Sequence, residues 1–452
     1  MTGTQPVDGN PVATSPSMLR VGATSLAGTA MEFYDLQIYG TATALVLPQL
    51  FFPTSDPFVG TLLAFSSLAI SYASRPLGGV IFGHLGDRIG RKRTLVATLL
   101  VMGVATVGIG VLPTYQSIGV AAPVLLILLR LVQSMAYGGE WGGAVLVAYE
   151  NAPPGRRNFF ASMPQTGLPL GTLLGDAVWV IVTTVLSHEE LLAWGWRIPF
   201  LTSVLVVLGG MAVRMAIGET PQFQRLVQDT GARAKRPVAE AFREHWREML
   251  LTGGSFLGFG VNATIAITYL IQYSTVEVGA PKSSILNVLL ISTAVQLVVM
   301  LGGGSLADRF GTRRILLIGA IGTAVTIFPQ CMAVSTGQFG WMLAGYLLCF
   351  AGFSAVCYGS LAALFATAFR VKTRYSGLSI GFQLATVIGG TSPLVAATLV
   401  RGTGSIVGVA VFIAAMLMVS TGCLLVLTRR FGSELEHGSN VAGTASANPS
   451  VA

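Results

Sequence analysis

Two carboxylates lie in a segment that otherwise has the composition of a lipid-facing helix. The stretch GTAMEFYDLQIYG, residues 28–40, contains Glu32 and Asp35 among glycine, aromatic and aliphatic side chains. Residues three positions apart project about 60° from one another on a helix, so both carboxylates face a common side. Two carboxyl groups this close in a low-dielectric site favour the sharing of at least one proton. The pair therefore predicts a proton-binding site, with a fixed salt bridge to an arginine as the alternative.

Two more carboxylates, Glu140 and Asp176, also fall inside apolar runs of the first half of the chain. A charge at the bilayer centre costs about 2.5–3.5 kcal/mol even on insertion scales, so each such residue requires a partner or a function. We predict that both belong to the proton-coupling groups together with the first pair. For Asp176 the alternative is a position near the outer water.

Two arginines share these apolar runs with the carboxylates. The planar fork of a guanidinium matches a carboxylate, so Arg130 is our leading anchor for an anionic solute, and Arg75 is a second candidate. Either arginine can also act as an internal counter-ion that competes with protons for Glu32 and Asp35. The alternative for Arg130 is a purely structural pair with Glu140 or Asp35.

Uncharged polar and aromatic side chains on the apolar runs are candidates for contact with a solute. A polar residue on a single span more often bonds a neighbouring helix, which is the alternative for each of them. The candidates are Tyr34, Tyr137, Trp141 and Gln165 in the first half of the chain, and Asn262, Tyr269, Gln272, Tyr358 and Gln383 in the second.

Other kinds of chemistry find little support in the sequence. The four histidines, His84, His188, His245 and His437, lie in predicted loops or a tail, and the four cysteines show no CxxC spacing. The sequence contains no residue set with metal-ligand spacing and no phosphate-binding glycine loop. We therefore expect neither an enzyme nor a metal or another cofactor.

Apolar helices must position these residues. The chain has 452 residues, of which 52% are hydrophobic and 10% charged, and its mean hydropathy of +0.70 is too high for a water-facing surface. A helix needs about 20 apolar residues to cross the hydrocarbon core. We predict an all-α membrane protein with twelve transmembrane helices, at residues 22–47, 59–83, 94–113, 119–147, 158–185, 198–217, 249–273, 283–307, 314–335, 338–368, 375–400 and 404–428.

The positions of the charges predict the orientation. A net charge of +8 would suggest a nucleic-acid partner in a soluble protein. Here, with the N-terminus inside, 21 of the 27 lysines and arginines lie in the tails and loops of one side. Because basic loops stay in the cytoplasm, we predict that both termini are cytoplasmic, that the lipid bilayer is a partner and that no nucleic acid binds.

A repeated loop divides the chain into two six-helix halves. Residues 83–93 read GHLGDRIGRKR and residues 304–314 read GSLADRFGTRR, with glycine, aspartate and arginine at a constant offset of 221. The long hydrophilic stretch 219–248 separates the halves. We predict a disordered cytoplasmic tail at 1–19, an N-terminal half at 20–218, a central cytoplasmic loop at 219–248, a C-terminal half at 249–428 and a cytoplasmic tail at 429–452.

The repeated loop resembles the signature of the major facilitator superfamily. The segments GTAMEFYDLQIYG, SRPLGGVIFGHLGDRIGRK, RLVQSMAYGGEWGGAVLVAYENAPPGRR, WGWRIPFL and ETPQF narrow the resemblance to its metabolite:proton symporters, which include shikimate, α-ketoglutarate, citrate and proline/betaine permeases, with the shikimate type most similar. This resemblance implies a monomer of the plasma (inner) membrane that imports a small organic acid or zwitterion with protons by alternating access. The alternatives are a proton-coupled antiporter that exports drugs or metabolites, and a non-transporting membrane sensor.

We expect the repeated loop to act in gating. Its aspartates can accept a hydrogen bond or an ion pair across the halves, and its glycines allow helices to approach closely. The alternative is a basic loop with turn glycines. The expected gating residues are Gly83, Asp87, Arg88, Gly90 and Arg91 in the first copy, Asp308 and Arg309 in the second, and Glu150 and Arg157 of an E-x6-R element. Because Thr367 replaces that glutamate in the second repeat, a latch formed by this element is not duplicated.

Overall fold

The computed structural model describes residues 18–53, 57–215, 218–230 and 237–444. All regular secondary structure in these residues is helical, as the sequence predicts. The first half contains α1 (Met18–Leu45), α2 (Leu47–Phe51), α3 (Pro57–Ile89), α4 (Arg91–Val111), α5 (Tyr115–Ile118), α6 (Ala121–Asn151), α7 (Arg157–Val185), α8 (His188–Glu190), the π-helical turn η1 (Leu191–Gly195) and α9 (Arg197–Met215), and α10 (Pro221–Thr230) follows it. The second half contains α11 (Pro237–Thr264), η2 (Ile265–Tyr269), α12 (Leu270–Gln272), η3 (Tyr273–Glu277), α13 (Lys282–Phe310), α14 (Thr312–Ser335), α15 (Phe339–Leu348), η4 (Cys349–Ser354), α16 (Ala355–Thr367), α17 (Arg374–Thr403) and α18 (Val407–Thr444).

Most of these helices have the length and hydropathy of membrane spans. Among the described residues nine helices qualify, or ten if the bent pair formed by residues 188–195 and 197–212 is one span. Helices α1 and α3, with 28 and 33 residues, are also long enough to cross a bilayer but are not among those nine. The total of twelve spans therefore stays a prediction.

The boundaries differ from the sequence prediction at the hydrophilic segments. The predicted central loop, 219–248, contains α10 and the beginning of α11, which start at Pro221 and Pro237. Proline is favoured at the first helical position, because its fixed φ suits a helix and its missing N–H is not needed there. Helix α18 continues through most of the predicted C-terminal tail to Thr444. The predicted N-terminal tail lies almost entirely outside the described residues.

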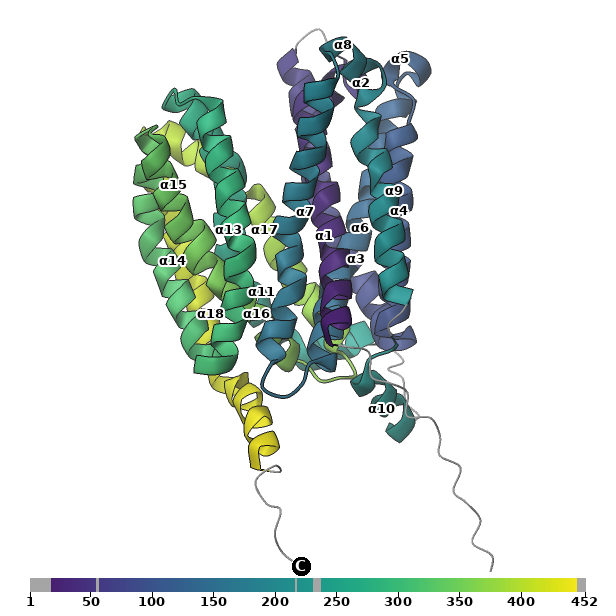
Figure 1. Cartoon of the computed structure of the whole chain (residues 1–452), viewed down its shortest axis with the longest axis vertical. Coiled ribbons are helices and arrows are strands. Elements are labelled where there is room, and N and C mark those ends of the chain that lie inside the picture. The colour runs from purple at the N-terminus through teal and green to yellow at the C-terminus, as the bar shows by residue number, and fades with distance from the viewer. Residues whose placement is uncertain (1–17, 54–56, 216–217, 231–236, 445–452) are drawn as a thin grey trace, which may run out of the picture.

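The helices form two bundles that follow the two halves of the sequence (Figure 1). Helix α1 begins and α18 ends at the bottom of Figure 1, and we call this the terminal end of the molecule. The bundles come together at the terminal end and diverge toward the opposite end, where α2, α5 and α8 lie. Across the halves, α3 packs against α17 and α7 packs against α13.

Glycines bring α7 unusually close to α1 within the first half. A Cβ atom added at Gly171 would overlap the carbonyl of Ala30 and would lie 2.7 Å from the backbone nitrogen of Tyr34. Gly167 and Gly175 occupy the preceding and following turns of the same face. Small residues at regular spacing permit such backbone contact between membrane helices. The position of α1, which carries Glu32 and Asp35, therefore depends on this glycine face of α7.

Two aspartates join the halves at the terminal end. Asp87, near the end of α3, is buried, and its Oδ1 and Oδ2 accept hydrogen bonds from the backbone nitrogens of Tyr375 at 3.1 Å and Ser376 at 2.9 Å. These nitrogens belong to the first turn of α17, where N–H groups lack helical partners and the helix dipole is positive. The carboxylate of one half thus caps a helix of the other half.

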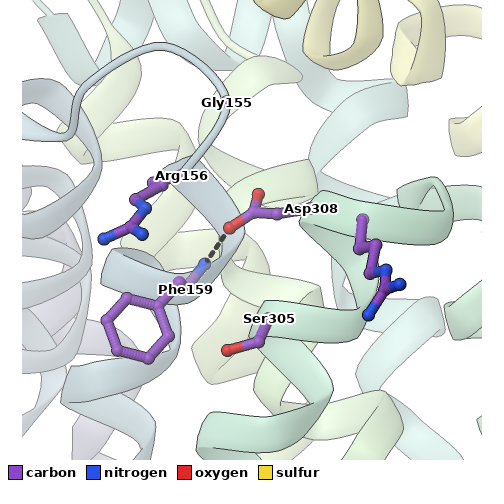
Figure 2. Close-up of a pocket in the computed structure, with 6 residues that line it drawn as sticks. Gly155, Arg156, Phe159, Ser305 and Asp308 are labelled. Carbon is purple, nitrogen blue, oxygen red and sulfur yellow. Dashed lines mark hydrogen bonds between the residues drawn. The ribbon is translucent and has the colours of Figure 1, made fainter.

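Asp308 makes the corresponding contact in the second repeat. Its Oδ1 accepts a hydrogen bond from the backbone nitrogen of Asn158 at 3.0 Å, and its Oδ2 accepts one from that of Phe159 at 2.9 Å. Figure 2 shows the aspartate pointing at the first turn of α7, beside a pocket that Arg156 and Ser305 also line. We call the two arrangements the Asp87 clamp and the Asp308 clamp.

Glycines of the repeated loop lie beside both clamps, where a larger side chain would not fit. A Cβ atom at Gly83 would lie 2.8 Å from the Cα atom of Ser376, and one at Gly304 would lie 2.8 Å from the carbonyl oxygen of Asn158. Gly90 and Gly311 have φ angles of +111° and +95°, which side chains other than glycine rarely adopt. These glycines therefore permit both the close approach of the halves and the turn after each clamp.

Charged residues surround the Asp87 clamp in a different pairing from the expected E-x6-R element. The buried guanidinium of Arg91 lies 3.6 Å from Asp87 and 3.8 Å from Glu150. Glu150 also accepts a hydrogen bond from Arg374 at 3.2 Å. Arg157 instead lies over the ring of Tyr149, with its Cζ atom 5.3 Å from the ring centroid. Glu150 therefore bridges the halves through Arg374, which is the repeat equivalent of Arg157. The other loop arginines, Arg88 and Arg309, are exposed.

The segment ETPQF, residues 219–223, completes this network, although it was not among the expected gating residues. Glu219 accepts a hydrogen bond from the backbone nitrogen of Arg91 at 3.0 Å, and so caps α4. Phe223 stacks on the Arg91 guanidinium, with its ring centroid 4.5 Å from Cζ. Gln222 accepts a hydrogen bond from Arg374 at 2.6 Å. The segment that follows the first half thus holds both arginines in place.

Substitution of Gly171 tests the packing of α1 on α7. We expect Gly171→Val to lower the free energy of unfolding by about 1–3 kcal/mol, because the new side chain overlaps the backbone of α1. Gly209→Val is the matched control, since Gly209 is exposed and has no atom within 4 Å of an added Cβ. The measurement is thermal unfolding of both variants in the same detergent. Equal stability of the two variants would contradict the proposed helix contact.

Substitution of Asp87 tests the clamp at the terminal end. Hydrogen bonds to a charged group contribute about 1.5–3 kcal/mol each, so Asp87→Ala should shift the equilibrium toward separation of the halves by about tenfold or more. The measurement is the distance between spin labels at exposed positions Arg93 and Arg313, in a variant that lacks the native cysteines. Glu189→Ala, at an exposed position of α8, is the control. An unchanged distance distribution in Asp87→Ala would show that the clamp does not hold the halves together.

Candidate functional site

Helix α1 carries both opening carboxylates into the interior of the first bundle. Glu32 and Asp35 are 3% and 0% exposed. Oε2 of Glu32 and Oδ1 of Asp35 have no hydrogen-bond partner among the described residues. A buried carboxylate with a free acceptor oxygen is costly as an anion, so the site favours binding of a proton or a cation.

The second oxygen of Asp35 belongs to a hydrogen-bonded group that includes Arg130. Oδ2 accepts hydrogen bonds from the Thr106 hydroxyl at 2.7 Å and from Nε2 of Gln133 at 3.3 Å. The Gln133 carbonyl oxygen in turn accepts a hydrogen bond from Nη1 of Arg130. Helices α1, α4 and α6 thus bring these four residues together, and Gln133 connects the arginine to the carboxylate.

Arg130 keeps part of its guanidinium unused. Its Cζ atom lies 3.8 Å from the centroid of the Tyr39 ring, which holds the guanidinium plane by a cation–π contact. Among the described residues, Nε and Nη2 have no hydrogen-bond partner, although the residue is 1% exposed. Those two nitrogens form the edge of the fork that suits a carboxylate.

Arg75 of α3 has a similar setting. Its guanidinium lies between two aromatic rings, with Cζ 4.4 Å from the Tyr72 centroid and 5.4 Å from that of Tyr137. Nε and Nη2 of this buried residue again have no hydrogen-bond partner in the described part of the chain. The site therefore contains two buried arginines, each with an unused pair of nitrogens.

Glu140 is paired with an arginine that was not among the predicted site residues. Its carboxylate forms a buried ion pair with Arg214 of α9, and its Oε2 also accepts a hydrogen bond from the Thr98 hydroxyl at 2.5 Å. The structural pair of Arg130 with Glu140, one of the alternatives given above, does not form. The two residues are ten positions apart on one helix, about 15 Å along its axis, and Glu140 pairs with Arg214 instead. Arg214 lies inside a predicted span, which is the signal that could have identified it.

Asp176 has an amide partner on α1. It is half-buried on α7 and accepts a hydrogen bond from Nε2 of Gln37 at 2.6 Å. This contact joins α7 to α1.

An aromatic stack connects the halves close to these charges. Trp141 lies parallel to Phe382 of α17, with ring centroids 3.6 Å apart, and Phe382 stacks on Phe256 of α11 at 4.5 Å. The indole nitrogen of Trp141 donates to Oε1 of Gln165 at 2.6 Å, and Nε2 of Gln165 donates to the carbonyl of Tyr358 at 3.3 Å. Three of the expected lining residues, Trp141, Gln165 and Tyr358, therefore meet where α6, α7 and α16 come together.

The other expected lining residues differ in their availability. The hydroxyl of Tyr34 donates to the Pro199 carbonyl at 2.8 Å, so this group is already used within the first bundle. Nε2 of Gln383 donates to the carbonyl of Gly138 at 3.3 Å, across the halves. The hydroxyl of Tyr137 has no partner in the described residues.

Three further candidates lie along the chain from the end of α11 through η2 to α12. Asn262 is buried, and neither atom of its amide has a partner among the described residues. Tyr269 is buried beside Tyr273, with ring centroids 6.3 Å apart, whereas Gln272 is exposed. Asn262 is thus the available hydrogen-bonding group of this set.

The arrangement can hold an anion and a proton at neighbouring points. The first half supplies guanidinium edges and unpartnered carboxylate oxygens, while the second half supplies uncharged aromatic and amide groups. In a low-dielectric interior, opposite charges that are not yet paired attract strongly. A bound carboxylate would reduce the free-energy cost of burying the arginines, and a bound proton would reduce that of burying the carboxylates.

Known proteins resemble this chain along most of its length. The Major Facilitator Superfamily matches residues 22–390. The "Shikimate transporter" of Escherichia coli K12 is 37% identical over 413 residues, which cover 90% of this chain and 94% of that protein. A "Proline/betaine transporter" of Salmonella typhimurium is 33% identical over 83% of this chain and 76% of that protein.

Solved structures share the fold at low sequence identity. The proton:xylose symporter XylE superposes with a TM-score of 0.73 at 16% identity and covers 93% of this chain and 98% of its own. The fucose:proton symporter FucP of E. coli gives a TM-score of 0.66 at 17% identity, with coverages of 90% and 97%. The repeated loop, the two bundles and these similarities agree: the chain belongs to the Major Facilitator Superfamily.

Proposed function

We propose that the chain is a proton-coupled symporter that imports a small organic acid or a zwitterionic metabolite by alternating access. The observation that carries this proposal is that the first bundle buries two arginines, Arg75 and Arg130, with unpartnered guanidinium nitrogens, together with two carboxylates, Glu32 and Asp35, that each have an unpartnered oxygen among the described residues. The relatives named for shikimate and for proline/betaine transport support the same substrate classes. These substrates share a carboxylate, which both guanidinium forks suit.

In this proposal the arginines bind the solute and the carboxylates bind the proton. Arg130 binds the carboxylate of the solute through Nε and Nη2, with Arg75 as a second anchor. Asp35 and Glu32 bind the proton. Once protonated, their neutral carboxyl groups no longer compete with the carboxylate of the solute for the arginines. Glu140 and Asp176 belong to the same proton-coupling set. Solute and proton therefore favour each other's binding, which is the requirement for symport.

Uncharged side chains complete the solute site in this proposal. They supply aromatic surface and hydrogen bonds from both halves, so that closure of the halves surrounds the solute. These side chains are Tyr34, Tyr137, Trp141, Gln165, Asn262, Tyr269, Gln272, Tyr358 and Gln383.

We place the terminal end in the cytoplasm of a bacterial cell, with the protein as a monomer in the plasma membrane. The concentration of 21 of the 27 basic residues in loops and tails of that side supports this orientation. The membrane potential then contributes about 2.3 kcal/mol per unit charge per 100 mV to inward movement of a positive charge. Opening of the Asp87 and Asp308 clamps would release the solute to the cytoplasm.

Uptake into proteoliposomes tests the proposed function. We expect wild-type protein to accumulate one labelled solute from a panel of shikimate, α-ketoglutarate, citrate, benzoate, proline and betaine when the outside is more acidic. Asp35→Asn should lose this accumulation, because an amide does not take up the proton. Accumulation in the variant equal to wild type would exclude Asp35 as a proton site. Proton-driven loss of solute from preloaded vesicles would identify an exporter instead.

A conservative substitution tests Arg130 as the anchor. Arg130→Lys keeps the charge but loses the planar fork, so we expect KM for the transported solute to rise about tenfold, equivalent to about 1.4 kcal/mol. The measurement is the initial uptake rate as a function of solute concentration. Arg225→Lys, an exposed residue of α10, is the matched control. If the two variants have the same KM, Arg130 does not bind the solute.

A further inference from the structure

Arg214 is a buried cation that the proposed binding of solute and proton leaves without a role. It lies near the end of α9 and is 3% exposed. Nη1 donates hydrogen bonds to the carbonyl oxygen of Leu95 at 2.6 Å and to Oε2 of Glu140 at 3.3 Å, and Nη2 contacts Oε1 of the same glutamate. Burial of a charge carries a desolvation cost that its partners must offset, and the partners of Arg214 are Glu140 and the α4 backbone.

The Glu140–Arg214 ion pair contacts α1, the helix that carries Glu32 and Asp35. A Cβ atom at Gly28 would overlap Arg214 and lie 2.6 Å from Oε1 of Glu140, so α1 covers the ion pair at Gly28. Glu32 follows Gly28 after four residues, about 6 Å along the helix, and Asp35 follows after three more. The three carboxylates therefore form a line toward the terminal end, with Glu140 last.

Glu140 and Glu32 differ in how well their charge is compensated. Both oxygens of Glu140 have partners, namely Arg214 and the hydroxyl of Thr98. Oε2 of Glu32 has none among the described residues. The titratable and charged groups that act on Glu140 from the packed elements are Arg214 on α9, Glu32 on α1 and Tyr375 on α17. Arg214 is the cation of this set, and it pairs directly with Glu140.

Tyr375 connects this carboxylate to the Asp87 clamp. Its backbone nitrogen donates to Asp87, and its hydroxyl donates to the carbonyl of Gly139 at 2.9 Å, next to Glu140 in the sequence. Cβ atoms at Gly86 or Gly143 would overlap this side chain, so it packs directly against both glycines, and it is fully buried. When the clamp opens and α17 moves away, this ring leaves the turn of α6 that carries Glu140.

We propose that Glu140 is the group from which the proton is released toward the terminal end, and that Arg214 is its positioning residue. This inference rests on the proposed proton symport. The proton leaves the carboxyl group of Glu32 and binds the carboxylate of Glu140, which separates from Arg214. Withdrawal of Tyr375 then admits water, the proton passes from Glu140 to water, and the ion pair with Arg214 forms again.

Infrared spectroscopy of the whole protein in lipid nanodiscs tests the ionisation of Glu140 without any solute. At neutral pH we expect Arg214→Met to show a carboxylic-acid C=O band that wild type lacks. The band should disappear in Arg214→Met/Glu140→Gln and should be absent in the exposed control Glu189→Gln. Persistence of the band in the double variant, or its absence from Arg214→Met, would overturn the role of Arg214.

Transport of labelled shikimate, or of the panel solute that wild type accumulates, tests release. We expect Glu140→Gln to reduce proton-driven accumulation by about a hundredfold, because the last proton acceptor is missing. Solute exchange between equal pH values should stay within about threefold of wild type, since exchange needs no net proton release. Normal accumulation in Glu140→Gln would overturn the proposal.

The neutral variant Arg214→Gln/Glu140→Gln separates release from a purely structural role. Two glutamines can hydrogen bond to each other, so recovery of accumulation would show that the pair only holds helices together. We expect no recovery. If wild type accumulates no solute, the proposed symport fails, whereas the infrared result still decides whether Arg214 keeps Glu140 ionised.

Discussion

The capping of a helix by an aspartate from the opposite half is the interaction on which the rest of the structure depends. Asp87 binds the first turn of α17, and Asp308 binds the first turn of α7. Each carboxylate meets backbone N–H groups that the helix cannot satisfy and the positive end of a helix dipole. Because both clamps lie at the terminal end, the bundles are joined there and diverge toward the other end (Figure 1).

The closed end also determines what surrounds the charges of the first half. Helix α17, held by the Asp87 clamp, places Phe382 against Trp141 and Tyr375 beside the turn of α6 that carries Glu140. In the low-dielectric interior, small changes in the partners of a carboxylate have large electrostatic effects. Proton binding and the separation of the halves can therefore influence one another through direct contacts of α6 and α17, without a long pathway.

The pairing of charges shows the limits of sequence reasoning at this site. Periodicity places Glu32 and Asp35 on one face of a helix, and both are buried as that spacing suggests. A motif resemblance groups Glu150 with Arg157 in one E-x6-R element, whereas the structure joins Glu150 to Arg374. Arg374 is more than two hundred positions away, and only the packing of the two halves brings it to Glu150.

The sequence by itself determined the helical membrane class, the repeat and the family, because hydropathy, loop charge and local motifs are properties of short segments. Tertiary structure decided which helices became neighbours, and hence that Arg214 meets Glu140, that Glu219 caps α4, and that Tyr34 is used within its own bundle. The physical reason is reach: hydrogen bonds and ion pairs act over a few ångströms, so their partners depend on helix packing that no local pattern records.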